Sequence, residues 1–310
     1  MEFNHIALLF TENCNARCKM CCDSRGFVKG KTLSRADLDF VLNSIKSVSS
    51  ISRIGITGGE PLLYPELVEH IINYDFERKM SFTIKSNGFW GKDYEKADAF
   101  VRKNKDRISY ISLSYDAFHR EFIPVSALIN IIHIAAKYGI HTDVVGCFLK
   151  NDVTPGDILN EFGEAAYYTE FYYQPVIKTG SACCFDEAKL IKLLNSDKID
   201  IRCTAVSEPT LLINAKMDLY PCCSQVIENT ILSFGNLRDS SLADIISEIV
   251  HNRVMFTVFT EGFSPFIEFM RKHNISYPKE LSSPCELCGC LFESDWFIKE
   301  LYDHGFYSDL

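Results

Sequence analysis

Ten of the thirteen cysteines in this 310-residue chain fall into three groups, and this grouping restricts the fold more than any other pattern in the sequence. The groups are Cys14, Cys18, Cys21 and Cys22; then Cys203, Cys222 and Cys223; then Cys285, Cys288 and Cys290. A reducing cytosol keeps thiols free, so grouped cysteines in a cytosolic chain are metal ligands or reactive thiols rather than disulfides. The sequence therefore predicts metal-centred or thiol chemistry.

Composition and charge indicate the cellular location of the protein and the kinds of partner that it is expected to lack. No apolar run reaches a membrane-spanning length, and the start, MEFNHIALLF, lacks a basic leader and a small-residue cleavage site. We therefore expect a cytoplasmic protein with no membrane partner. The net charge is -9, from 32 basic and 41 acidic residues, which argues against binding a phosphate backbone as the main task. A nucleic-acid partner is not expected.

The first 182 residues alternate short β-rich runs with amphipathic helices, which predicts a parallel sheet with crossover helices. We expect helices capped by Ser34, opened by Pro65 and running from Pro124 to Tyr138, with Gly139 after the last of these. Six strand and helix units result, and their strands are expected at 5–10, 53–57, 81–85, 108–113, 141–148 and 169–177.

The alternation of β-rich runs and amphipathic helices ends at about residue 183. The stretch PTLLINAKMDLYP at 209–221 predicts a hairpin that delivers Cys222 at the end of its second strand. Helices are expected at 241–252, 261–273 and 294–304, with CELCGC at 285–290 forming a knuckle between the last two. We therefore predict two domains, 1–182 and 183–310, of which the second is too small to need a large core of its own.

The cysteine loop after the first strand reads CNARCKMC, with the spacing Cys-x3-Cys-x2-Cys. Iron-sulfur clusters prefer thiolates, and a [4Fe-4S] cluster has four irons to ligate. Three cysteines leave one iron open, so it can chelate the amino and carboxylate groups of a substrate. The alternative is a structural zinc site completed by Cys22 or His5.

This loop resembles that of the radical S-adenosylmethionine (radical SAM) superfamily, in which Cys14, Cys18 and Cys21 would hold a cluster that cleaves SAM to a 5'-deoxyadenosyl radical. GITGGEP at 55–61 is similar to the family's strand-two motif. The resemblance implies that Gly58, Gly59 and Glu60 bind the methionine amino group. It also implies a partial (β/α)6 barrel with SAM and the cluster at the carboxyl ends of its strands.

Two further stretches match the family by offset. Ser114 and Asp116 in SLSYDAFH stand where the family contacts the ribose, although a Ser-x-Asp is also common turn chemistry. Gly180 in PVIKTGSA matches the adenine-contacting turn. One departure concerns the residue before Cys21, which is often aromatic in the family and is Met20 here. Met20 weakens the adenine assignment and leaves the cluster assignment unchanged.

The carboxyl-terminal cysteines resemble an auxiliary-cluster domain of the Twitch type, related to SPASM domains. The resemblance implies a second [4Fe-4S] cluster, and the four ligands expected for it are Cys203, Cys222, Cys285 and Cys288. The alternative is a zinc ribbon held by the same four cysteines.

Cys223 directly follows a predicted ligand. Successive side chains of an extended chain point to opposite sides, so if Cys222 faces the auxiliary cluster, Cys223 is expected to face the barrel mouth. A thiol there can return hydrogen to a planar carbon radical on the face opposite to abstraction, which inverts an L-residue. The alternative is that Cys223 is a small, buried hydrophobic residue.

Several stretches narrow the resemblance to the YydG (EpeE) type of radical SAM peptide epimerases: TENCNARCKMCC, SNGFWG, SYDAFH, YPCCSQ and CELCGCLF. It implies conversion of L- to D-residues in a ribosomally synthesised precursor peptide, supported by a low-potential electron donor. Cys223 would be the hydrogen donor, and Glu208 is the candidate for an acidic residue near it. The remaining cysteines are expected to pack: Cys22, Cys147, Cys183 and Cys184.

Two other functions stay open. A radical SAM maturase could form thioether or carbon-carbon crosslinks in a peptide with the same cysteines. A non-enzymatic iron-sulfur or zinc protein would leave the GGEP motif without a task. Release of 5'-deoxyadenosine from SAM separates the second function from the radical enzymes.

Overall fold

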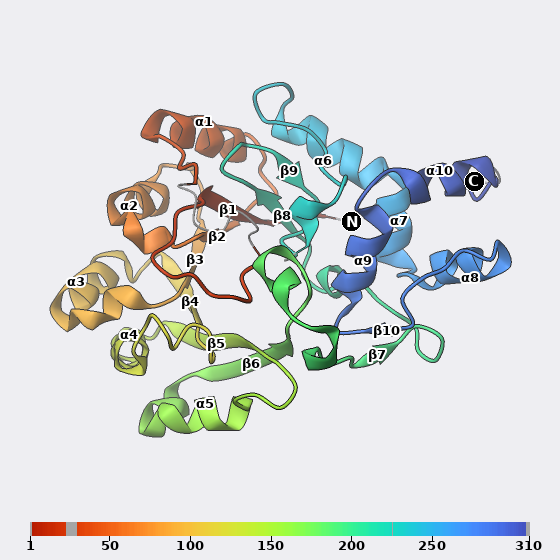
Figure 1. Cartoon of the computed structure of the whole chain (residues 1–310). Coiled ribbons are helices and arrows are strands. Elements are labelled where there is room, and N and C mark those ends of the chain that lie inside the picture. The colour runs from red at the N-terminus through yellow and green to blue at the C-terminus, as the bar shows by residue number, and fades with distance from the viewer. Residues whose placement is uncertain (1, 23–29, 225, 308–310) are drawn as a thin grey trace.

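Six parallel strands curve into an open barrel, with helices on the outer side (Figure 1). The computed structural model describes residues 2–22, 30–224 and 226–307, so Gln225 of the YPCCSQ stretch lies outside the described residues. The predicted strands are all confirmed, with small shifts at their ends: β1 (His5–Thr11), β2 (Arg53–Gly58), β3 (Ser81–Ser86), β4 (Ile108–Ser114), β5 (His141–Phe148) and β6 (Glu170–Pro175).

Helices follow the strands of the barrel, as the alternation predicts: α1 (Arg35–Lys46), α2 (Pro65–Asn73), α3 (Tyr94–Asn104), α4 (Val125–Lys137) and α5 (Pro155–Glu161). Ser34 caps α1 as predicted, because its Oγ accepts from the Asp37 N–H at 3.1 Å. The strand side chains that point to these helices are buried, such as Phe82 and Ile84 in β3. The alternate strand side chains form the inner face of the barrel.

The predicted hairpin is confirmed as β8 (Thr210–Ile213) and β9 (Leu219–Tyr220). It continues the barrel sheet, because β8 pairs in parallel with β1. The resulting strand order is β6-β5-β4-β3-β2-β1-β8-β9, and one hydrophobic core joins the two predicted domains. A separate two-stranded sheet pairs β7 (Leu194–Asn195) with β10 (Glu280–Leu281). The boundary at 182/183 stays a prediction.

Five helices follow the hairpin: α6 (Leu242–His251), α7 (Arg253–Thr260), α8 (Ser264–Lys272), α9 (Pro284–Phe292) and α10 (Trp296–Asp303). The prediction missed α7, which Asn252 caps, and Gly262, with φ of 76°, separates it from α8. The predicted knuckle at 285–290 is wrong. This stretch lies within α9, because Ser283 caps it and Leu287 and Leu291 bury one face at helical spacing.

Short 3-10 turns complete the chain between these elements: η1 (Pro61–Leu63), η2 (Phe89–Lys92), η3 (Gly163–Tyr168), η4 (Gly180–Cys184), η5 (Glu187–Lys189), η6 (Thr204–Val206) and η7 (Ile227–Asn229). Across the described part of the chain, every helix is too short or too polar to span a lipid bilayer.

Candidate functional site

The cysteine loop leaves β1 at the carboxyl edge of the sheet and carries the three predicted ligands Cys14, Cys18 and Cys21. The Cys21 N–H donates to the Cys18 carbonyl at 3.0 Å, so the second half of the loop is a tight turn. Burial raises the pKa of Cys14 to about 11, and it raises that of Cys18 further; the neighbouring thiols of the loop add to both shifts. The three predicted ligands therefore lie within electrostatic reach of one another.

The Gly58-Gly59 turn is joined to the start of this loop by backbone hydrogen bonds. The Gly59 N–H donates to the Thr11 carbonyl at 2.7 Å, and the Glu60 N–H donates to the Asn13 carbonyl at 2.8 Å. A Cβ on Gly59 would lie 2.3 Å from the Asn13 oxygen, and this close approach excludes any other residue. Binding of the methionine amino group by this turn stays a prediction.

Glu60 is 0% exposed, and its carboxylate joins the end of β2 to the end of β3. It accepts hydrogen bonds from Leu62 N (3.0 Å), Ser86 Oγ (2.9 Å) and Asn87 N (2.7 Å). Burial has the largest effect and raises the pKa of Glu60 to about 7, although these hydrogen bonds lower it. Asn87 in turn donates to Asn15 Oδ1 at 2.8 Å, so the predicted methionine-binding carboxylate is tied to the cysteine loop through protein contacts.

Asp116, a predicted ribose contact, is 1% exposed at the end of β4. Its carboxylate accepts from the N–H groups of Phe118, His119 and Cys147 at 2.9, 3.0 and 2.9 Å. Burial alone would raise the pKa of Asp116, but the bonds from His119 and Cys147 outweigh it and lower the pKa. These contacts match the turn alternative for the Ser-x-Asp pattern. Ser114 ends β4 opposite Val145, and both ribose assignments stay predictions.

Gly180 packs directly against the cysteine loop. Its φ is +57°, and a Cβ there would lie 2.1 Å from the Cys22 carbonyl oxygen. The next residue, Ser181, donates its N–H to the Cys21 carbonyl at 2.9 Å. The requirement for glycine therefore comes from this contact and from the left-handed backbone. The predicted adenine contact is an additional role that stays a prediction.

We expect Gly180→Ala to lower the free energy of unfolding by about 2 to 4 kcal/mol, because a backbone clash adds to the left-handed strain. The matched control is Gly139→Ala, where φ is +69° and no atom lies within 4 Å of the new Cβ. It should cost only about 1 kcal/mol. Chemical denaturation of both variants measures the difference, and equal losses would show that the contact with Cys22 is unimportant.

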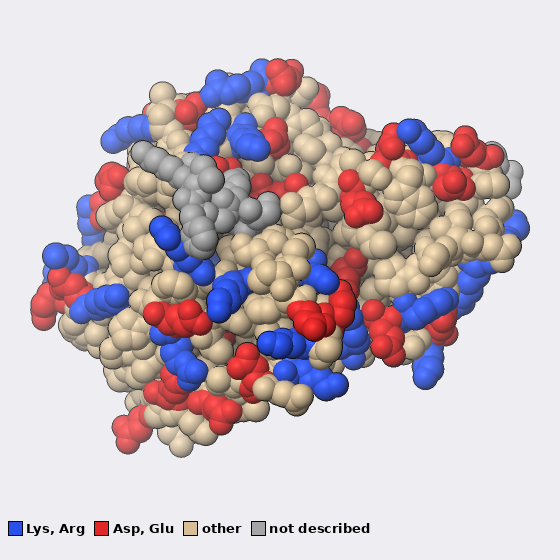
Figure 2. Space-filling model, in the orientation of Figure 1, with Lys and Arg blue, Asp and Glu red and all other residues tan. Residues whose placement is uncertain are grey.

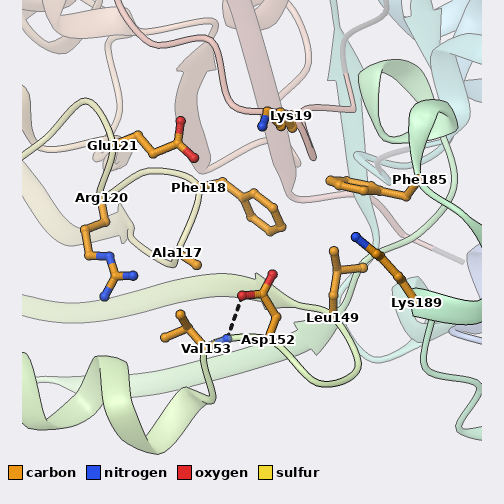
Figure 3. Close-up of a pocket in the computed structure, with 10 residues that line it drawn as sticks. All are labelled: Lys19, Ala117, Phe118, Arg120, Glu121, Leu149, Asp152, Val153, Phe185 and Lys189. Carbon is orange, nitrogen blue, oxygen red and sulfur yellow. Dashed lines mark hydrogen bonds between the residues drawn. The ribbon is translucent and has the colours of Figure 1, made fainter.

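A pocket of about 410 Å³ opens beside the cysteine loop, at the carboxyl ends of β4 and β5 (Figure 3). The rings of Phe118 and Phe185 line it, with centroids 5.6 Å apart. Met20 packs against the buried cluster that includes Phe118. Two aromatic rings from other segments therefore lie near the position where the family often has its aromatic residue. Sequence analysis missed both, because neither stands beside a motif cysteine.

The four predicted ligands of the auxiliary centre come from three segments: Cys203, Cys222, and Cys285 with Cys288. Burial raises the pKa of Cys288, and the thiols of Cys285 and Cys203 add to the shift. Cys222 is only 8% exposed, and burial is the main reason that its pKa is raised. The nearby thiol of Cys288 raises the pKa further. The predicted ligands of the auxiliary centre thus influence one another electrostatically, and four thiolates would suit a cluster or a zinc ion equally.

Cys223 is exposed to solvent, unlike its neighbour Cys222, so the alternative of a buried hydrophobic residue is wrong. Desolvation by the surrounding protein still raises the pKa of the Cys223 thiol. The positive charge of Lys85, on the inner face, acts in the opposite direction and lowers it. Because β9 runs antiparallel to β8, the chain leaves it toward the amino-terminal ends of β1 and β8. The segment that carries Cys223 therefore leaves the sheet on the side opposite to the cysteine loop. That the Cys223 side chain faces the barrel mouth stays a prediction.

Glu208 lies at the amino-terminal ends of β1 and β2, where the Arg53 guanidinium donates to its carboxylate. The side chains of His5 and Thr210 hydrogen-bond beside it at 3.1 Å. Its charge is near enough to Cys223 to raise that thiol's pKa slightly. A catalytic role for Glu208 stays a prediction. His5 begins β1 and the cysteine loop follows the end of that strand, so His5 cannot complete a zinc site there.

Burial, followed by the charge of Arg53, lowers the pKa of His5 to about 4. The unfolded chain, with an ordinary histidine, then binds more protons than the folded chain between about pH 6.5 and 4. We therefore expect stability to fall as the pH drops through this window. Lowering the pH from 7 to 4.5 should cost the natural protein about 2 kcal/mol more than the His5→Gln variant. Urea titrations at both pH values test this, and parallel losses would contradict it.

The other cysteines divide by exposure. Cys147 is buried at the end of β5, as the packing prediction requires. Cys22, Cys183 and Cys184 are exposed, so the packing prediction is wrong for them. Within residues 2–22, 30–224 and 226–307, no three Cys, His, Asp or Glu side chains stand close enough together to coordinate a single metal ion. The individual cluster ligands therefore stay predictions.

Charge on the face shown in Figure 2 is mixed. Lys and Arg side chains lie among Asp and Glu, and among the described residues of this face they do not gather into one basic surface. This face therefore does not favour a strongly acidic or a strongly basic partner by charge.

Comparison with known proteins identifies the family. The sequence model of the radical SAM superfamily matches residues 8–165, which contain the end of β1, the cysteine loop, the Gly58-Gly59 turn and the strands β2 to β5. This chain belongs to the radical SAM superfamily. SAM and a [4Fe-4S] cluster are accordingly its cofactors, and the three cysteines of the loop, which influence one another electrostatically, fit the thiolate preference of the cluster.

Relatives extend the similarity over the whole chain. It is 24% identical over 306 residues to the "Putative peptide biosynthesis protein YydG" of Bacillus subtilis (strain 168), covering 96% of this chain and 95% of that protein. Among solved structures, anSMEcpe with bound AdoMet and Kp18Cys peptide has a TM-score of 0.58 at 14% identity, covering 97% and 96%. Streptococcus suis SuiB bound to precursor peptide SuiA has a TM-score of 0.58 at 13% identity, covering 84% and 67%. At these identities the structures support the fold alone, including its carboxyl-terminal region.

Proposed function

We propose that this radical SAM protein is a peptide epimerase, which converts L- to D-residues in a ribosomally synthesised peptide. The observation that carries the proposal is the contrast between two adjacent cysteines. Cys222 is buried, with the thiols of Cys288 and Cys203 acting on its pKa, whereas Cys223 is exposed and the charge of Lys85 acts on it. In this proposal the first sulfur would ligate a second [4Fe-4S] cluster, and its neighbour would stay protonated and available to react. Full-length similarity to a peptide biosynthesis protein supports a peptide substrate.

The two ends of the barrel would supply the two halves of the reaction. Cys14, Cys18 and Cys21 would hold the first cluster, which together with SAM would supply the radical chemistry that removes the α-hydrogen of a substrate residue. The cysteine loop lies at the carboxyl edge of the strands, and the segment that carries Cys223 leaves the sheet on the amino side. A Cα held between them loses hydrogen on one face and gains the Cys223 thiol hydrogen on the other. A one-electron reductant and a proton then restore the thiol from its thiyl radical.

Mass spectrometry in deuterated water tests this proposal. The substrate probe is a panel of synthetic peptides covering the short open reading frames beside the gene, incubated with cluster-loaded enzyme, SAM and dithionite. Because a thiol hydrogen exchanges with solvent, each converted residue should gain about one dalton, and chiral amino-acid analysis should find a D-residue. Peptide mass in ordinary water should stay unchanged.

The same assay separates the alternatives. A maturase that forms a thioether or carbon-carbon crosslink would remove two hydrogens from the peptide in either solvent. A non-enzymatic iron-sulfur or zinc protein would release no 5'-deoxyadenosine from SAM under reducing conditions. Either result would replace the epimerase proposal.

A further inference from the structure

A row of polar side chains crosses the inner face of the barrel. Lys85 of β3 pairs in register with Ser112 of β4, and Ser112 pairs with Asp143 of β5. Register partners in neighbouring parallel strands point to the same side of the sheet. The adjacent residues Ile84, Leu113 and Val144 are fully buried under the outer helices, so the row itself faces inward. A core made only for stability would place apolar side chains here.

Asp143 has an unused hydrogen-bond acceptor. The residue is 8% exposed, and its Oδ1 is buried with no partner anywhere in the described chain. Burial raises the pKa of Asp143, while the hydroxyl groups of Ser112 and Tyr110 and the charge of Lys85 oppose the shift. A buried acceptor without a donor is costly, so this oxygen is suited to receive an N–H group from a ligand.

Lys85 is an unused donor at the other end of the row. It is exposed, and none of the described carboxylates forms an ion pair with it. Its positive charge acts on Asp143, on Cys147 and on Cys223. A group bound by Lys85 therefore lies within the electrostatic reach of the charge that also influences Cys223.

We propose that Asp143 and Lys85 bind one backbone peptide unit of the substrate, with Asp143 accepting its amide N–H and Lys85 donating to its carbonyl oxygen. Two strand spacings separate their backbones, about 10 Å, which leaves room for an extended peptide between the side chains. A trans peptide unit presents its N–H and C=O in opposite directions, toward one residue each. Presentation of the adjoining Cα to Cys223 is the part of this inference that rests on the epimerase proposal.

The charges of the row favour a neutral ligand with both a donor and an acceptor. A cationic side chain at this position would meet Lys85, and an anionic one would meet Asp143 and its register partner Glu170. A peptide unit avoids both repulsions and satisfies both residues. Backbone recognition would also allow residues with different side chains to be presented to the same thiol.

Binding without turnover tests this site independently of epimerisation. The probe is a tetrapeptide of alanine with an acetylated amino end and an amidated carboxyl end, which offers backbone groups and methyl groups only. It is titrated calorimetrically into cluster-loaded, SAM-loaded enzyme without reductant. Four analogues each replace one amide N–H with an ester oxygen. At least one ester should bind the natural protein about 10- to 100-fold more weakly, because a hydrogen bond to a charged acceptor is lost.

Asp143→Ala should bind the parent tetrapeptide as weakly as that ester analogue and should not discriminate between the two. Asp143→Asn keeps an acceptor and should retain part of the discrimination, which covers the case in which the alanine variant folds poorly. Lys85→Met should weaken all five ligands alike, whereas the matched control Lys103→Met, on the outer surface of α3, should weaken none. Equal ester effects in the natural protein and both Asp143 variants, or no saturable binding of the tetrapeptide, would overturn the assignment.

Discussion

Replacing Cys223 with alanine is expected to abolish formation of D-residues while SAM cleavage continues. The variant loses the only proposed hydrogen donor, so the substrate radical cannot be quenched on the inverting face. We expect D-residue formation to fall by at least about 100-fold, equivalent to roughly 3 kcal/mol in the barrier. Chiral analysis of the peptide and chromatography of 5'-deoxyadenosine measure the two outcomes in the same reaction.

Cys290 is the matched control for this variant. It is a partly exposed cysteine of the same region and has no assigned ligand role, so Cys290→Ala should leave both products unchanged. Iron content should also stay the same in both variants, because Cys222 and not Cys223 is the proposed ligand. Persistent inversion by Cys223→Ala, or loss of about four irons from it, would refute the division of roles between the two sulfurs.

Replacing Cys18 with alanine should remove the first cluster and all radical chemistry with it. Iron content should fall from about eight to about four atoms per chain, and 5'-deoxyadenosine release should drop by at least about 100-fold. Anaerobic iron analysis of the reconstituted protein and SAM-cleavage assays test this directly.

Cys147→Ala provides a control for packing at the same place. Its thiol is buried to nearly the same degree, 8% exposed against 9% for Cys18, and both belong to one small hydrophobic cluster. The cost of the cavity should therefore be similar in the two variants. If Cys147→Ala lost iron as Cys18→Ala does, instability of the cluster pocket and not ligation would explain the result.

The polar row and Cys223 together suggest how an open barrel controls a reactive radical. The cysteine loop, the Gly58-Gly59 turn and the Gly180 turn are tied together by short backbone contacts. Movement of one of them would displace the others, so cluster and SAM geometry should be rigid. Substrate position would instead be set by side chains of the inner face, which are free of the contacts that hold the cofactor end.

Local patterns in the sequence were sufficient for most of the barrel. Alternation of β-rich runs and amphipathic helices predicted all six strands, because hydrophobic periodicity records which face of each element is buried. Ser34 and Gly139 identified helix ends for reasons that lie within a few residues of each position. The cysteine spacing and the GGEP stretch gave the family, because these ligands and turns are close together in the chain.

Failures of prediction came where local signals were weak or competed. CELCGC was expected to be a knuckle because of its cysteine spacing, yet Ser283 caps a helix through it and two leucines bury one face. The exposed Cys183 and Cys184 were expected to pack, although burial depends on which segments cover them. Glu208 was named from the family resemblance and its catalytic role stays a prediction, but its ion pair with Arg53 could not be anticipated from residues 155 positions apart.

The sequence by itself determined the order of strands and helices, the cysteine loop and the presence of two thiols side by side. Only the tertiary structure decided that β8 joins β1, that the chain leaves β9 toward the amino-terminal ends of β1 and β8, and that Lys85 and Asp143 share a row with an unsatisfied acceptor. The physical reason is that strand pairing and register are long-range choices. They depend on how whole elements bury their faces against one another, and no local pattern records that outcome.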